Sequence, residues 1–178
     1  MPKNSREQID EDEKKILLEL QTDGKSRIEG IAKKCGFSRQ KVWRVIKRLE
    51  KDKTIWGYHA VVDTEKMGLK RYLILIKRTQ KHFSKEQVDI ITSRQVTQAA
   101  LKLGITIECS YFLHGSYDWF FLVTAKDIRF VKKTIETFNI LLKGFFSEIK
   151  VEEVIFPVET NNFTNPNLDQ IKEFFISE

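Results

Sequence analysis

The sequence predicts an α+β fold made of a small helical unit followed by a unit built around an open sheet. Two short segments with apolar side chains at helical spacing flank Gly36 in the first third of the chain. From Lys70 onward, β-type runs alternate with amphipathic helices in the order β-α-β-β-α-β. The chain has 178 residues, of which 41% are hydrophobic, so each of two small units can bury a core.

The first predicted helix begins with an acid-rich turn over residues 10–13, which suits the positive end of a helix dipole. Asp23 and Gly24 end this helix. Its apolar stripe consists of Ile9, Ile16, Leu17 and Leu20. Because this stripe can cover the apolar faces of the next two helices, we expect a compact trihelical unit.

Residues 26–51 predict two helices joined by a glycine turn. Ser26 and Glu29 have the spacing of a capping box and predict the start of the first helix. Gly36 ends that helix, because glycine alone enters the left-handed conformation without steric cost. Ser38 is the predicted N-cap of the second helix. The apolar stripe of the second helix is Val42, Val45, Ile46 and Leu49.

The opposite face of this second helix is basic, and between residues 33 and 53 only Glu50 and Asp52 oppose the positive charge. A basic helix face is often simply solvated. The glycine turn is more specific, because it gives the pattern of a helix-turn-helix, whose second helix enters the major groove of double-stranded DNA. We therefore predict DNA contacts by Ser38, Arg39, Gln40, Lys41, Trp43, Arg44, Lys47, Arg48 and Lys51.

These contacts are predicted to be of two kinds. Arg39, Gln40 and Arg44 suit base edges, because arginine pairs with guanine and glutamine with adenine through two hydrogen bonds. Trp43 lies one residue off the apolar stripe, so it either contacts DNA or covers the edge of the domain. Phosphate contacts are predicted for Lys47, Arg48 and Lys51.

The second unit is predicted to be a ferredoxin-like βαββαβ domain with both helices on one face of the sheet. Its strands are expected at residues 72–79, 105–114, 119–125 and 146–158. One helix is expected to begin at a capping box of Ser84 and Gln87 and to continue to Leu103 along a single apolar face. The other helix covers residues 128–142 and is capped by Gly144.

Four segments are expected along the chain. They are a helix-turn-helix domain at 1–63, a linker at 64–69, the ferredoxin-like domain at 70–160 and a C-terminal extension with a helix at 161–178. Residues 54–63 are rich in β-branched and aromatic side chains and are interrupted by Gly57. This run is a wing or a connecting strand, so the first domain is predicted to be a winged helix-turn-helix.

Other functional classes receive little support. The sequence shows no paired carboxylates, metal-ligand cluster, nucleophile with a base or Gly-rich phosphate loop, so we expect no enzyme, metal or cofactor. Cys35 and Cys109 are expected to be reduced thiols in the core. No apolar run approaches the ~20 residues of a membrane helix. The first residues lack the apolar core of a signal peptide, which favours a cytoplasmic location.

This combination of features resembles the Lrp/AsnC family of archaeal and bacterial transcription regulators over nearly the whole chain. The matching segments are IDEDEKKILLELQTDGK, IAKKCGFSRQKVWRVIKRLE, IWGYHAVVD and HGSYDWFFLV. The chain departs from the family at Val45, where an arginine is frequent, and at Arg39 and Lys41, where prolines are frequent. The segment 84–115 is also longer than usual.

The resemblance implies a sequence-specific regulator whose second domain senses an amino acid or a related small molecule. Residues Gly115, Ser116, Tyr117 and Asp118 lie where family members hold the effector between subunits. Gly115 would let a ligand carboxylate approach backbone amides, and Asp118 would hold an ammonium group. The alternative is a hairpin turn in which Asp118 accepts a hydrogen bond from its own backbone.

An open sheet with helices on one face leaves its other face to be buried, so we expect a homodimer through the sheet. Large apolar side chains for this contact are Leu73, Leu75, Tyr111, Phe120 and Leu122. A dimer would read half-sites ~10 base pairs apart or a multiple of this; the resemblance also admits an oligomer of dimers. The alternative function is an architectural DNA-binding protein with low sequence specificity and no effector.

Overall fold

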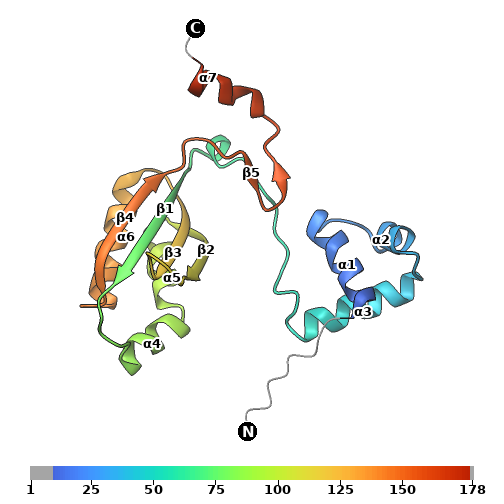
Figure 1. Ribbon diagram of the computed structural model, residues 1–178, viewed down its shortest axis with the longest axis horizontal. Coiled ribbons are helices and arrows are strands. Elements are labelled where there is room, and N and C mark those ends of the chain that lie inside the picture. Colours follow the sequence, from blue (N-terminus) through green and yellow to red (C-terminus); the bar gives the residue numbers. More distant parts are fainter. Residues whose placement is uncertain (1–9, 177–178) are drawn as a thin grey trace. The chain divides into compact units, whose positions relative to one another are not determined.

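The computed structural model describes residues 10–176, whose elements are shown in Figure 1. Contacts divide the chain into two units, of which the second comprises Val62–Pro157. The first comprises Met1–Val61 together with Val158–Glu178, so it is discontinuous in sequence. Ile9, predicted to belong to the first apolar stripe, lies outside the described residues.

Three helices form the body of the first unit: α1 (Glu11–Thr22), α2 (Ile28–Cys35) and α3 (Arg39–Lys51). Asp10 is the N-cap of α1, and its carboxylate accepts a hydrogen bond of 2.8 Å from the backbone N–H of Glu13. The core of the unit consists of the buried side chains Ile16, Ile31, Ala32 and Val42. One residue comes from α1, two from α2 and one from α3, which confirms the expected trihelical arrangement.

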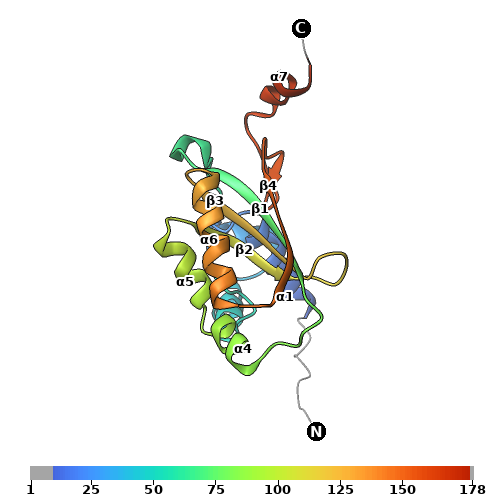
Figure 2. The same cartoon turned by 90° about the vertical axis from the view of Figure 1, so that its left-hand side faces the viewer.

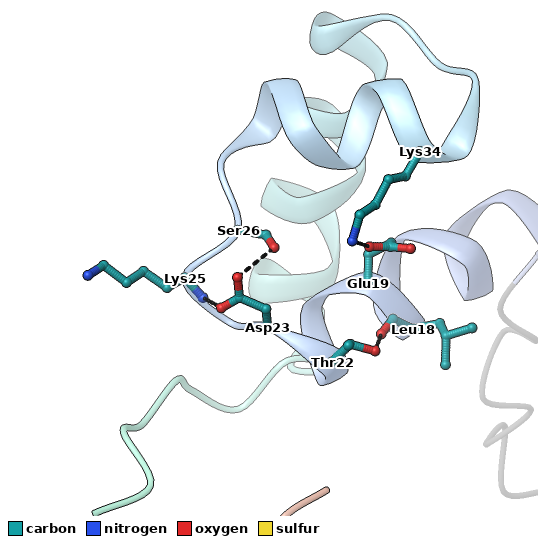
Figure 3. Close-up of polar contacts among 7 residues, drawn as sticks. All are labelled: Leu18, Glu19, Thr22, Asp23, Lys25, Ser26 and Lys34. Atoms are coloured by element: carbon teal, nitrogen blue, oxygen red, sulfur yellow. Dashed lines mark hydrogen bonds and ion pairs between the residues drawn. The ribbon is translucent and has the colours of Figure 1, made fainter. Parts of the chain in front are cut away.

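The predicted capping box of Ser26 and Glu29 is wrong. The N-cap is one residue later, at Arg27, which makes no side-chain capping hydrogen bond, and the helix begins at Ile28. Figure 3 shows the reason: the hydroxyl of Ser26 donates to Oδ2 of Asp23 at 3.0 Å. Asp23 also accepts from the backbone N–H of Lys25 at 2.9 Å. The turn after α1 therefore engages the Ser26 hydroxyl, which was expected to cap α2.

The turn between α2 and α3 follows the prediction. Gly36 has φ +69° and is the C-cap of α2, a conformation that costs other residues steric energy. The hydroxyl of Ser38 accepts a hydrogen bond of 3.2 Å from the backbone N–H of Lys41 and caps α3. Beyond α3, residues 55–63 include no paired strand, so a wing hairpin is not formed in this part of the described chain.

The second unit contains one four-stranded sheet made of β1 (Lys70–Arg78), β2 (Thr106–Phe112), β3 (Trp119–Ala125) and β4 (Phe146–Glu153). The strand order is β2-β3-β1-β4 and all three pairings are antiparallel. This confirms the ferredoxin-like arrangement. β4 ends at Glu153 rather than at residue 158, because its antiparallel partner β1 begins nearby, at Lys70, with Tyr72 opposite Glu153.

The helices of this unit are α4 (Lys85–Thr92), α5 (Gln95–Lys102) and α6 (Ile128–Leu141). Figure 2 shows α5 and α6 on the same side of the sheet. They bury Val96, Ala100 and Phe138 against the inward side chains of the strands, among them Ile74 and Phe121. Both helices therefore cover one face, as predicted.

The single helix expected from Ser84 to Leu103 is two helices. The capping box of Ser84 and Gln87 is present, but α4 ends at Thr92 with Ser93 as its C-cap, and Arg94 has φ +61°. Because a left-handed residue cannot continue an α-helix, the apolar stripe is divided between α4 and α5. Gly144 is likewise not the cap of α6, whose C-cap is Leu142.

The opposite face of the sheet carries the apolar side chains that the sequence could not assign to a side. Leu73 pairs with Leu122 and Leu75 with Phe120, and Phe120 also pairs with Tyr111. Residues opposite each other in an antiparallel pair point to the same side of the sheet. All five therefore share the face away from α5 and α6, where Tyr111 is 58% exposed.

The remaining elements are η1 (Glu65–Met67), β5 (Glu159–Thr160), β6 (Phe163–Thr164), η2 (Leu168–Gln170) and α7 (Ile171–Phe175). The polar loop expected at 161–167 contains a tight hairpin, in which Asn161 and Asn162 both have positive φ. Asn161 contacts Nε2 of His59 through its Nδ2 atom at 2.8 Å. Within the described residues, no helix is long and apolar enough to cross a membrane.

Candidate nucleic-acid interface

The exposed start of α3 forms one wall of an open depression of about 670 Å³. Its lining consists of Ile28 from α2 and of Arg39, Gln40, Trp43 and Arg44 from α3. Residues three and four positions apart lie on one helix face, so the geometry of α3 brings these side chains together. The three predicted base-reading residues thus lie next to one another, around Trp43.

Trp43 does not serve the core of the trihelical unit. Its side chain is 51% exposed, whereas the neighbouring Val42 is fully buried. Two of its neighbours in the depression are the cationic residues Arg39 and Arg44. Trp43 therefore presents an exposed aromatic ring between two cations.

Several basic side chains of α3 are engaged by acids of the same unit. Exposed pairs form between Arg39 and Glu29 of α2 and between Lys47 and Glu50, the latter at 2.9 Å between Nζ and Oε2. Two further pairs join α3 to the first turn of α1, namely Lys41 with Asp12 and Arg48 with Glu13. Within the described residues, Arg44 and Lys51 form no ion pair with the chain.

The pairs with α1 give Lys41 and Arg48 a structural role. Glu13 is buried and also completes the capping box of α1, so Arg48 places a positive charge beside a carboxylate that has little water around it. The hydrogen bond from Lys41 lowers the pKa of Asp12 below its usual value. The Lys41 ammonium also lies 4.0 Å from the centre of the Phe37 ring.

Sequence reasoning missed the acids Asp12, Glu13 and Glu29 as partners of the basic face. The cluster at 11–13 was interpreted only through the helix dipole, and Glu29 only through a capping box. A signal was available, because neighbouring acids at the start of α1 can pair with cations that are two turns apart on α3, as Lys41 and Arg48 are. Using that signal requires knowing how the two helices pack.

The loop from Gly115 to Asp118 connects β2 and β3. Asp118 does not accept from its own hairpin backbone, contrary to the alternative drawn from the sequence. Its carboxylate accepts from the backbone N–H of Arg78 at 2.8 Å and from Nε of the same residue at 3.1 Å. Asp118 therefore fastens this loop to the end of β1.

The other residues of this loop differ in exposure. Gly115 and Ser116 are exposed, and a Cβ atom added to Gly115 would meet nothing within 4 Å. Tyr117 is half-buried, with the Lys150 ammonium 5.7 Å from its ring centre. A hydrogen bond with Tyr117 raises the pKa of Lys150. The backbone therefore does not itself require a glycine at position 115.

The thiols and other donor groups give no sign of a metal centre. Among the described residues, no group of three or more His, Cys, Asp or Glu side chains could hold a metal ion. Cys35 and Cys109 are free and half-buried, and burial raises the pKa of both thiols. They are therefore weak nucleophiles at neutral pH.

Known proteins share both units. A family model described as winged helix-turn-helix DNA-binding matches residues 9–55. The leucine-responsive regulatory protein of Haemophilus influenzae is 26% identical over 163 residues, covering 92% of this chain and 93% of that protein. Both matches concern the sequence, and the residues matched by the family model include α1, α2 and α3.

Solved structures match the fold over most of the chain. An AsnC family transcriptional regulator from Agrobacterium tumefaciens is similar with a TM-score of 0.62 and 22% identity, covering 92% of this chain and 99% of that one. A transcriptional regulator from Neisseria meningitidis, solved as a complex with L-Met, has a TM-score of 0.62 and 16% identity, with 90% and 99% covered. The two-unit fold is therefore that of known regulators.

Proposed function

We propose that this chain, a member of the Lrp/AsnC family and a DNA-binding transcription regulator, recognises a specific double-stranded DNA sequence with α3. The observation that carries this proposal is the clustering of Arg39, Gln40, Trp43 and Arg44 around one exposed depression at the start of α3. Guanine and adenine edges in the major groove match the donors of these arginine and glutamine side chains. We place the DNA-binding function in residues 1–63 and its site of action in the cytoplasm.

The basic residues differ in what they offer to DNA. Arg44 and Lys51 have no ion-pair partner among the described residues, so they are available to DNA without loss of an internal contact. Arg39 would have to break its ion pair with Glu29 before it could bind a base. Lys47 would have to break its ion pair with Glu50 before it could bind a phosphate. Lys41 and Arg48 hold α1 against α3, so their contribution to DNA binding is the positive charge that they add near the phosphate backbone of the DNA.

Two copies are needed, because one trihelical unit covers few base pairs. We propose that the sheet face with Leu73, Leu75, Tyr111, Phe120 and Leu122 pairs with the same face of a second copy. Such a self-complementary contact gives a two-fold dimer. Two α3 helices related in this way would read half-sites ~10 base pairs apart or a multiple of this.

Selection from random duplex DNA tests this function, with wild type and Arg44→Ala as the two proteins. We expect an enriched sequence for the wild type, and a loss of ~1–3 kcal/mol on that sequence for Arg44→Ala if Arg44 binds a base. Lys51→Ala is the matched control: a phosphate contact should weaken all sequences alike and reduce the salt dependence. If nothing is enriched although DNA is bound, the chain is an architectural protein instead.

An amino-acid effector is the second part of the proposal. The Neisseria meningitidis relative was solved with L-Met, and the loop 115–118 of this chain offers an unobstructed glycine beside a carboxylate. A ligand that binds only the folded state raises the melting temperature by mass action. A thermal-shift screen of the twenty amino acids, starting with L-Met, measures this directly.

The variant for that screen must preserve the loop. Asp118→Asn keeps an oxygen that accepts from the Arg78 backbone but removes the negative charge, so it should lose the shift and retain the fold. Ser93→Ala, remote in sequence from the loop, should retain the shift. If Asp118→Asn responds like the wild type, the carboxylate does not hold the effector.

A further inference from the structure

The depression on α3 combines two chemistries. Arg39, Gln40 and Arg44 provide hydrogen-bond donors, whereas Trp43 and Ile28 provide apolar surface. Donors account for the recognition of purine edges, but they leave the apolar part without a partner. If α3 binds DNA as proposed, the partner of this apolar surface is an apolar group that the duplex presents next to those purine edges.

The major groove of DNA presents one apolar group on its base edges, the C5-methyl group of thymine. We propose that Trp43 and Ile28 form a contact for this methyl group, next to a base that is bound by Arg39, Gln40 or Arg44. The inference rests on the proposed function and adds one specificity-determining contact to it. It assigns a thymine to each half-site of the recognised sequence.

The position and exposure of Trp43 support this assignment. Trp43 is 51% exposed, whereas Val42, Val45 and Ile46 of the same helix pack in the trihelical core, so the free surface of Trp43 is not used by that core. The flanking cations Arg39 and Arg44 would hold the polyanionic duplex against the same wall. Base faces are stacked inside a duplex, so a helix in the groove meets edges, and the methyl group is the edge that suits an indole.

Deoxyuridine isolates the methyl group, because it pairs with adenine as thymine does and lacks only the C5-methyl. The probe is the enriched duplex from the selection, with each thymine replaced singly by deoxyuridine. Because burial of one methyl group contributes about fourfold in affinity, deoxyuridine should lower wild-type affinity about fourfold at one thymine of each half-site. At the other thymines the affinity should be unchanged. Fluorescence anisotropy measures the affinities.

Variants then assign the contact. Trp43→Ala should bind thymine and deoxyuridine duplexes equally at that position, and Trp43→Phe should restore part of the difference. Trp56→Ala is the matched control, because Trp56 is 94% exposed but lies outside α3 and outside the depression. It should keep the full fourfold penalty.

The outcomes separate this inference from the proposed function. A wild type that is insensitive to deoxyuridine at every thymine overturns the methyl contact while specific DNA binding stands. The same holds if Trp43→Ala retains the penalty or if Trp56→Ala removes it. Failure of the selection to yield any preferred sequence overturns the specific-binding proposal, and the methyl contact with it.

Discussion

Individual ion pairs on α3 show how a basic side chain can stabilise the fold and also add positive charge for DNA binding. The Arg48–Glu13 pair joins the last turn of α3 to the first turn of α1, and Glu13 is buried. A cation beside a buried carboxylate offsets the cost of removing that carboxylate from water. The Lys47–Glu50 pair has more exposed partners within one helix and contributes much less.

Replacing these two cations distinguishes the roles. Arg48→Gln should lower the free energy of unfolding by about 1–2 kcal/mol, because Glu13 loses its charged partner. Lys47→Gln, the matched control, should change it by less than about 0.5 kcal/mol. Urea unfolding of the full chain measures both. Equal stability of the two variants would contradict a structural role for Arg48.

Residue-scale features were predicted unevenly from the sequence. Ser38 and Gly36 were identified correctly because capping and positive φ depend on the residue itself and its immediate neighbours. Ser26 and Asp118 were misinterpreted, since each has a partner that competes with the expected one: Asp23 for the former and Arg78 for the latter. The assignment of Arg39, Gln40 and Arg44 to bases stays a prediction, and the structure adds that these three residues and Trp43 line one depression.

At the level of elements, periodicity located the strands and most helices. β3 was predicted at its observed bounds because a continuous apolar run, WFFLVTA, lies between two clear breaks. The division between α4 and α5 could not be predicted, since the apolar spacing continues across it and Arg94 is not a residue that favours positive φ. β4 was predicted too long because a strand ends where its partner ends, which sequence alone does not reveal.

The left-handed Arg94 gives a test of that division. Arg94→Gly should raise the free energy of unfolding by about 0.5–1 kcal/mol, because the steric cost of positive φ exceeds the entropic cost of glycine. Arg94→Val should lower it by at least about 1 kcal/mol, because a branched side chain tolerates this conformation poorly. Thermal and urea unfolding measure the pair. A stabilising valine would indicate an uninterrupted helix.

The N-cap of α6 predicts a dependence of stability on pH. Hydrogen bonds from Arg129 and from the first backbone amides of the helix lower the pKa of Asp127 from 3.8 to about 2. A carboxyl with a depressed pKa stabilises the folded state above pH 4, and this contribution is lost as the pH falls through 2. Asp127→Asn keeps an acceptor but does not titrate.

The difference in unfolding free energy between wild type and Asp127→Asn should therefore shrink steadily from pH 4 to pH 2. Urea titrations at several pH values measure it. Asp89→Asn serves as the control, because Asp89 lies inside α4 and caps no helix. A constant difference across this range would mean that Asp127 titrates normally.

For the whole molecule, we propose that assembly depends on the sheet face opposite the helices. Phe120→Lys places a charge on that face, so it should convert the proposed dimer to a monomer and lower affinity for a two-half-site DNA about 100- to 10,000-fold through loss of avidity. Light scattering and anisotropy measure the two effects. Ile140→Lys is the control, because Ile140 lies on α6 and is already 77% exposed. Dimers that survive Phe120→Lys would place the contact elsewhere.

The discontinuity of the first unit has a consequence for biosynthesis. On the ribosome α1, α2 and α3 emerge first, and their contacts are local enough to form early. The sheet must wait for β4, because β1 pairs with this strand, which begins only at Phe146. Asn161, the partner of His59, is made later still. A nascent chain halted at Pro157 would hold α1, α2, α3 and the complete sheet. It would lack the segment that begins at Val158, which belongs to the first unit and includes the partner of His59.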